Sequence, residues 1–130
     1  MPTEQKKPER ERKPPYCVLL IDDNQAIIEA FAAGLTAEGY FVHATTHGGE
    51  LFQLASRLDP DVLVMDMIME GIDTPNAITA FRQSHPGMKI IAISGNPHLT
   101  KIALKCGAHQ ALAKPFRLDK LSLAIRLAMQ

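Results

Sequence analysis

Short apolar runs alternate along this chain with longer segments in which apolar side chains recur every three or four residues. A short run of consecutive apolar residues is typical of a strand buried on both faces. Recurrence at the helical period instead predicts an amphipathic helix. The first run, Tyr16 to Ile21, ends at two aspartates, and the segment after it carries its apolar residues at helical spacing: Ile27, Ile28, Phe31 and Leu35.

The alternation continues through the chain and predicts five strands and five helices. The expected strands are 16–21, 40–44, 62–65, 89–93 and 110–113, and the expected helices are 24–38, 48–58, 74–84, 97–105 and 118–129. Strands and helices that alternate at this spacing predict a parallel sheet with helices on both faces and right-handed crossovers. The predicted fold is therefore a three-layer α/β protein, a (βα)5 doubly wound parallel sheet.

Residues 1–15 lack this pattern. They hold five cations, three anions and four prolines, with almost no apolar side chain. Such a segment buries too little apolar surface to offset the entropy of ordering it. We predict a disordered, charged, Pro-rich tail over residues 1–15 and one folded domain over residues 16–130. A docking or localisation role for the tail is the alternative.

Composition narrows the class of protein without naming a function. The formal net charge is +0 and 46% of the residues are hydrophobic, so nothing draws the whole chain to nucleic acid or to a membrane surface. No apolar run approaches the length of a membrane span, the N-terminus lacks an apolar signal segment, and the two cysteines match no metal or redox spacing. These features favour a cytoplasmic protein without membrane insertion or direct nucleic-acid binding.

Polar residues stand where the predicted strands end. Asp22 and Asp23 follow the first strand, Asp66 the third, Ser94 the fourth and Lys114 the fifth. All strands of a doubly wound sheet point the same way, and ligands bind outside their carboxyl ends where the strand order reverses. In the order 2-1-3-4-5 that point lies between the first and third strands. The three aspartates should converge there, with Ser94 and Lys114 approaching from the other side.

Three carboxylates at one point repel each other unless one holds a proton or a cation lies among them. Oxygen ligands with room for water suit Mg²⁺ better than zinc. A carboxylate beside Mg²⁺ can attack phosphorus, and charge then builds on the equatorial phosphoryl oxygens. Mg²⁺, the Lys114 ammonium and the Ser94 hydroxyl would stabilise that charge from three directions.

Four fragments at these strand ends resemble the receiver domain of two-component response regulators: LLIDDN at 19–24, VLVMDMIM at 62–69, IAISG at 91–95 and KPF at 114–116. The resemblance covers residues 15 to 130 and implies a flavodoxin-like fold. It implies that Asp66 is the phospho-acceptor, that Ser94 follows the phosphoryl group and that Lys114 pairs with it through a cis bond to Pro115. The magnesium ligands that it implies are Asp22, Asp23, Asp66 and the backbone carbonyl of Ile68.

Three departures from the family pattern bear on how phosphorylation would be transmitted through the domain. Glu70 replaces a common proline after the acceptor, and Thr74 replaces a glycine. Ala111 stands where the family often has an aromatic ring that swings inward when the hydroxyl moves. Without that ring, either the signal travels through loop and helix movement or the switch is weak.

The resemblance leads us to expect a single-domain response regulator in two-component signal transduction. It would not be an enzyme beyond self-catalysed phosphorylation and dephosphorylation. A sensor histidine kinase or a phosphotransfer protein would donate the phosphoryl group. Because the chain ends after the last predicted helix, output is expected through protein contacts or phosphorelay. The expected contact surface is the fourth helix, fifth strand and fifth helix of a monomer or weak dimer.

Two other classes are weighed against this one. A pseudo-receiver, whose partner binding phosphate does not control, stays open because of Glu70 and Ala111. Enzymes such as aspartate-nucleophile phosphatases place a DxDx[T/V] motif after the first strand, where this chain reads Asp22-Asp23-Asn24-Gln25. A flavodoxin-like electron carrier needs a hydroxyl-rich loop at the same place, and the chain has none there.

Overall fold

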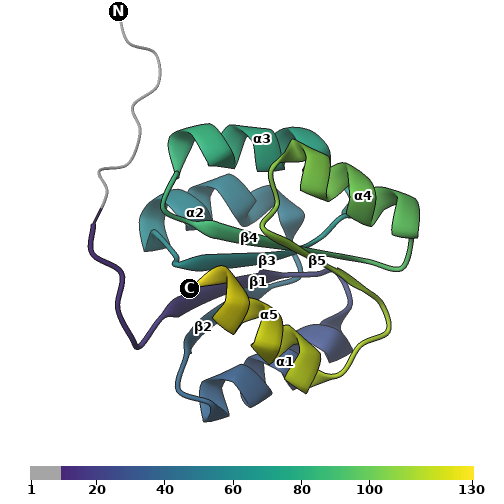
Figure 1. Cartoon of the computed structure of the whole chain (residues 1–130). Helices are drawn as coiled ribbons and strands as arrows, with labels where there is room; N and C mark the ends of the chain where they lie inside the picture. Colours follow the sequence, from purple (N-terminus) through teal and green to yellow (C-terminus); the bar gives the residue numbers. More distant parts are fainter. Residues whose placement is uncertain (1–9) are drawn as a thin grey trace, which may run out of the picture.

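Five parallel strands form the middle layer of the computed structural model, which describes residues 10–130 (Figure 1). Their order is β2-β1-β3-β4-β5, as predicted. The strands are β1 Cys17–Ile21, β2 Phe41–Thr45, β3 Val62–Asp66, β4 Lys89–Ser94 and β5 Gln110–Ala113. The helices are α1 Gln25–Ala37, α2 Leu51–Leu58, α3 Thr74–Ser84, α4 Pro97–Cys106 and α5 Leu118–Ala128, with a 3-10 turn η1 Gly48–Glu50 before α2.

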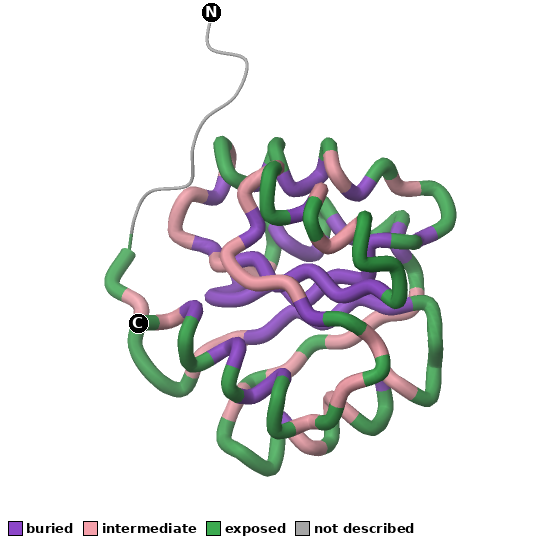
Figure 2. Tube along the Cα trace, turned by 45° about the vertical axis from the view of Figure 1, so that its right-hand side comes forward, coloured by how far each residue is buried: buried purple, intermediate pink, exposed green. Residues whose placement is uncertain are grey.

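The helices cover the sheet from both sides (Figure 1): α2, α3 and α4 lie on one face, α1 and α5 on the other. Successive strand residues point to opposite faces, so Leu19 packs towards α2–α4 and Leu20 towards α1 and α5. The central strand β3 is buried at every position. In Figure 2 the middle of the sheet is almost continuously buried, whereas the helices alternate between buried and exposed turns. The strands β1, β3 and β4 show the burial that their apolar runs predict, but the edge strands β2 and β5 are mostly half-buried or exposed.

The observed elements differ from the prediction at several boundaries. The second strand is Phe41–Thr45 rather than 40–44, and the second helix begins with η1 rather than as one regular α-helix. In α5, Leu127 is 45% exposed, and the small residues Ala124 and Ala128 face the core instead. Within residues 10–130, no helix combines the length and the apolar character needed to cross a bilayer.

Helix N-caps fix how the chain leaves the carboxyl edge of the sheet. The side chains of Asn24, Asp73 and Asn96 accept hydrogen bonds from backbone N–H groups in the first turns of α1, α3 and α4. Such caps satisfy N–H groups that have no partner inside the helix. They hold the residues that precede each helix, including the polar residues at the ends of β1 and β4, in one arrangement.

The last part of the predicted tail contacts the domain. Arg10 and Arg12 form ion pairs of 2.9–3.2 Å with Asp59 and Asp61 in the turn before β3. The same guanidinium groups donate to the carbonyls of Asp59 and Pro60. We call Arg10, Arg12, Asp59 and Asp61 the amino-end cluster. The predicted disorder of residues 1–9 lies outside the described residues, and within residues 10–15 Arg10 and Arg12 contact the folded domain.

Candidate functional site at the carboxyl edge of the sheet

Three carboxylates meet where β1 and β3 end. Asp66 is the last residue of β3, and Asp22 directly follows β1, its neighbour in the sheet. Asp22, Asp23 and Asp66 each offer an oxygen within 4.8 Å of the others. Asp22 and Asp66 are buried, whereas Asp23 is exposed. The predicted convergence of the aspartates at the switch in strand order is therefore confirmed.

Lys114 directly follows the edge strand β5, and its side chain reaches the group of three carboxylates from there. Its Nζ lies 2.7 Å from Oδ2 of Asp22 and 2.9 Å from Oδ2 of Asp66. Its backbone N–H donates to the carbonyl of Ser94 at 2.9 Å, which ties the end of β5 to the end of β4. The bond between Lys114 and Pro115 is cis, as predicted. We call Asp22, Asp23, Asp66, Ser94 and Lys114 the acidic site.

The carboxyl ends of β1, β3 and β4 close with the same local turn. Oδ1 of Asp22 accepts from Asn24 N–H, and Oδ1 of Asp66 accepts from Ile68 N–H, at 2.9 and 3.0 Å. Ser94 Oγ, which is almost fully buried, accepts from Asn96 N–H at 3.0 Å. One oxygen of each buried carboxylate is thus fixed by the backbone. The other, Oδ2, faces the Lys114 ammonium.

The charges of this group act on each other. Burial raises the pKa of Asp22, although the contact with Lys114 opposes the rise. Burial alone would lower the pKa of Lys114, but its contacts with Asp22 and Asp66 outweigh burial and raise it. Lys114 is therefore a cation at neutral pH. With all groups ionised, three carboxylates and one ammonium leave a formal charge of −2.

This arrangement fits a small divalent cation. The three acidic donors are oxygens, which Mg²⁺ prefers. Apart from its ion pair with Lys114, the buried Oδ2 of Asp22 has no hydrogen-bond partner among the described residues. Lys114 offsets only part of the charge. Asp22, Asp23 and Asp66 are thus the side chains that would hold Mg²⁺. The role of the Ile68 carbonyl as a further ligand stays a prediction.

Two supports of the site were not foreseen from the sequence. Thr74 Oγ1, buried at the start of α3, donates to the carbonyl of Met67 at 2.6 Å and holds the loop that follows Asp66. The ring of Phe116 stacks on Phe31 of α1 at 5.2 Å, next to Lys114. No periodicity in the sequence marks either contact. Ala111 is partly buried in β5 opposite Ala92, so this position presents no ring.

A family model described as "Response regulator receiver domain" matches residues 18–126. The chain belongs to this family. Receiver domains are phospho-acceptor modules of two-component signalling, and they interact with histidine kinases or phosphotransfer proteins. The match includes every residue of the acidic site, and the predicted family and fold are confirmed.

Individual relatives agree with this assignment. The response regulator MprA of Mycobacterium leprae is 28% identical over 115 residues, which cover 87% of this chain and 50% of that protein. A receiver domain from Bermanella marisrubri superposes with a TM-score of 0.80 at 26% identity, with 88% and 98% of the two chains covered. A response regulator from Burkholderia pseudomallei, solved with a phosphorylated aspartic acid and a calcium ion, has a TM-score of 0.75 at 26% identity, with 88% and 66% covered. The chain spans a quarter to a half of the curated relatives it matches first.

Proposed function

We propose that this receiver domain accepts a phosphoryl group on Asp66 in a Mg²⁺-dependent reaction. The observation that carries the proposal is the contact between Lys114 Nζ and Oδ2 of Asp66 at 2.9 Å, inside a group of three carboxylates. Asp66 Oδ1 is occupied by the Ile68 N–H. Oδ2 is then the oxygen that attacks, because the cation beside it can also pair with an arriving phosphoryl oxygen.

In the transfer step, Oδ2 of Asp66 forms a bond to phosphorus while the bond between phosphorus and the donor's imidazole nitrogen breaks. The electron pair of that bond stays on the nitrogen, and no oxidant or reductant is needed. Lys114 and Ser94 hold two of the equatorial oxygens, on which charge develops. For Lys114 this means exchanging its contacts with Asp22 and Asp66 for a phosphoryl oxygen.

Bound Mg²⁺ would supply the positive charge that lets an anionic phosphoryl group approach three carboxylates. Asp22 and Asp23, with the Ile68 carbonyl, would hold the ion beside Asp66. Oδ2 of Asp22 is buried and, among the described residues, is bound by its ion pair with Lys114 alone. This oxygen and the exposed carboxylate of Asp23 are suited to that task. The phosphorylated aspartate and calcium ion named for the Burkholderia pseudomallei relative support this assignment.

The direct test is intact-mass measurement after incubation with acetyl phosphate. Wild-type protein should gain the mass of one phosphoryl group when Mg²⁺ is present and little when EDTA removes it. Asp66→Ala should gain none in either condition. The proposal would be rejected if Asp66→Ala gained as much phosphoryl mass as wild type, or if wild type gained the same mass with EDTA as with Mg²⁺.

We infer that a histidine kinase or phosphotransfer protein is the natural donor and that output passes through protein contacts of the α4–β5–α5 face. On this face Leu104, Leu123 and Leu127 are 49%, 48% and 45% exposed, beside the exposed cations Lys101 and Arg126. Exposed apolar side chains among charges are typical of interaction surfaces.

The second candidate is a pseudo-receiver that binds its partner with or without phosphate. The observation that favours it is Ala111, which provides no ring to report a movement of Ser94. Partner affinity measured before and after phosphorylation separates the two. Equal affinities favour the pseudo-receiver, and a difference favours the phosphate-controlled module.

A further inference from the structure

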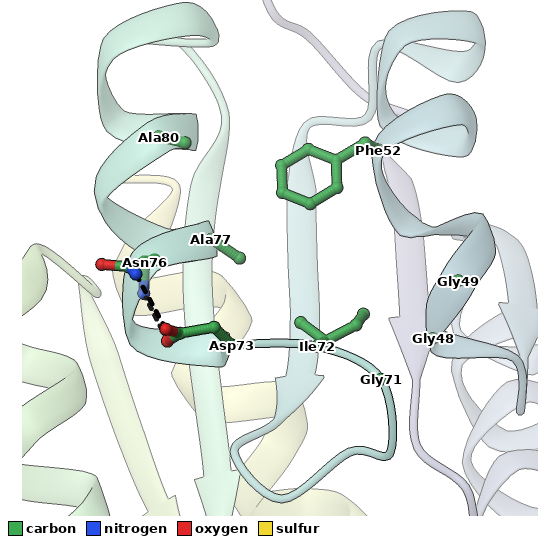
Figure 3. Close-up of a pocket in the computed structure, with 9 residues that line it drawn as sticks. All are labelled: Gly48, Gly49, Phe52, Gly71, Ile72, Asp73, Asn76, Ala77 and Ala80. Carbon is green, nitrogen blue, oxygen red and sulfur yellow. Dashed lines mark hydrogen bonds between the residues drawn. The ribbon is translucent and has the colours of Figure 1, made fainter.

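Helices α2 and α3 lie next to each other on one face of the sheet and leave a hollow between them (Figure 3). It lies at the N-terminal ends of both helices, between η1 and the loop that leads from β3 to α3, and its volume is about 370 Å³. This falls at the lower end of the size range of ligand pockets, about 300–1,000 Å³. We call it the α2/α3 groove.

The groove exists because both of its walls carry small residues. A Cβ atom added at Gly49 or Gly71 would meet no further atom within 4 Å, and Ala77 and Ala80 line the α3 wall. The opposite wall holds Phe52, whose ring stacks on Phe81 at 4.8 Å and is still 50% exposed. In Figure 3 the Phe52 ring points across the groove towards α3. The walls therefore offer an apolar surface with room for an inserted side chain.

The charge around the groove has one sign. Asp73 lines the groove itself, and an adjoining hollow that shares its glycines is lined by Asp23 and Glu70. Among the described residues lining the two hollows there is no lysine or arginine. Since the whole chain has a formal net charge of +0, this acidity is local. It favours a cationic partner and disfavours an acidic one.

We propose that the α2/α3 groove binds a cationic segment of a partner protein, which inserts one large apolar side chain between α2 and α3. The apolar anchor would fill the space beside Phe52, and flanking lysines or arginines would pair with Asp73 and Glu70. In protein interfaces, large side chains commonly fill a central hollow while charged residues lie at the rim. The surface is separate from the α4–β5–α5 face and does not require phosphorylation of Asp66.

The probe is a synthetic peptide with one phenylalanine flanked by glycines and two lysines at each end. Two matched peptides replace the phenylalanine by serine or the lysines by glutamates. Binding is followed by the amide NMR signals of isotope-labelled protein in excess Mg²⁺, which competes with the lysines for the acidic site. The phenylalanine–lysine peptide should shift the amides of Gly49, Gly71 and Ala80. Each matched peptide should bind about tenfold more weakly.

Filling the groove supplies the matched protein variants. Gly49→Leu and Ala80→Leu put a side chain into the hollow and should weaken binding of the phenylalanine–lysine peptide about tenfold. Ala33→Leu, at an exposed position of α1 on the other side of the sheet, should bind like wild type. All three variants should gain phosphate like wild type, which keeps this test separate from that of Asp66.

Three outcomes would overturn the proposal. Equal binding of the serine peptide would mean charge attraction alone. Shifts confined to residues 22–24 would place the peptide at the acidic site instead. Shifts of the groove amides that grow with protein concentration before peptide is added, together with a larger particle in sedimentation, would show that a second copy of this chain is the occupant.

Discussion

The two ends of the sheet each hold a group of aspartates, at least one of them buried, beside cationic side chains, but only one of these groups is balanced in charge. At the amino end, Arg10 and Arg12 face Asp59 and Asp61, two charges against two. At the carboxyl end, three aspartates meet and Lys114 is the one cation among the described residues that pairs with them, through Asp22 and Asp66. The difference in charge comes from one more aspartate and one fewer cation at the carboxyl end.

The carboxylate oxygens at the two ends also differ in their hydrogen bonds. Every carboxylate oxygen of Asp59 and Asp61 has a hydrogen-bond donor: the guanidinium groups and, for Oδ2 of Asp61, the N–H of Cys17 at 2.7 Å. At the other end, Oδ2 of buried Asp22 has its ion pair with Lys114 and no hydrogen bond among the described residues. The amino-end cluster is balanced in charge, although the buried Nε of Arg12 has no hydrogen-bond partner among the described residues. Balanced charges stabilise the fold, whereas surplus charge leaves room for a ligand. Substitutions at either end of the sheet test this difference.

The largest effect should come from removing a cation at the amino end. Arg12 has a side chain only 11% exposed and bonds both aspartates and the Pro60 carbonyl. Arg12→Ala would leave Arg10 as the remaining cation of the cluster and take the donor from Oδ1 of Asp59, so it should lower the free energy of unfolding by about 2–4 kcal/mol. Urea unfolding measures the loss. Lys13→Ala, at an exposed position, is the control, and equal stability of the two variants would mean that the amino-end cluster contributes nothing.

The next effect should be stabilisation by Mg²⁺ at the carboxyl end. At a concentration about tenfold above its dissociation constant, the ion should add roughly 1.4 kcal/mol to the stability of the wild type. Asp23→Asn should lose most of this gain and Asp59→Asn should keep it. Thermal unfolding with and without Mg²⁺ measures both. A gain that Asp59→Asn abolishes would place the ion at the wrong end of the sheet.

A smaller effect of opposite sign to the first should follow from neutralising one surplus charge. In EDTA and low salt, Asp23→Asn should stabilise the protein by up to about 1 kcal/mol, because it relieves repulsion with Asp22 and Asp66. High salt should screen the gain. Urea unfolding at two salt concentrations tests this, and a loss of stability at low salt would contradict the surplus of negative charge.

The smallest expected effect is a pair of opposite pH dependences. Burial raises the pKa of Asp22 in the folded protein above the unfolded value of 3.8. The contribution of Asp22 to stability is therefore fully present below pH 3.8 and is lost as the pH rises through the folded pKa. Burial also acts on Asp59, but hydrogen bonds and charges from Arg10 and Arg12 lower its pKa overall. The contribution of Asp59 to stability is therefore present above pH 3.8 and is lost as the pH falls through the folded pKa.

Stability curves of Asp22→Asn and Asp59→Asn against pH measure these contributions. Relative to wild type, Asp22→Asn should gain as pH rises through the acidic range, and the deficit of Asp59→Asn should shrink as pH falls. Parallel curves for the two variants would mean that the two ends do not differ in this respect.

The sequence predicted the carboxyl end far better than the amino end, for a physical reason. Asp22, Asp66 and Lys114 stand at the ends of apolar runs, and a parallel sheet brings such ends together. Arg10 and Asp59 are instead joined by a long-range contact between a segment without periodicity and a turn, and only the folded chain places them side by side. The same limit applies to Thr74 and to the hollow beside Phe52, which depend on how side chains pack.

The most direct test of the central claim is to locate the phosphoryl group itself. Borohydride reduces an aspartyl phosphate to homoserine, which peptide mass spectrometry can assign to a position. After reaction with acetyl phosphate and Mg²⁺, wild type and Asp59→Asn should each carry homoserine at position 66 and nowhere else, and Asp66→Asn should carry none. Homoserine at position 22, 23, 59 or 61 in the wild type, or modification that persists in Asp66→Asn, would contradict the account.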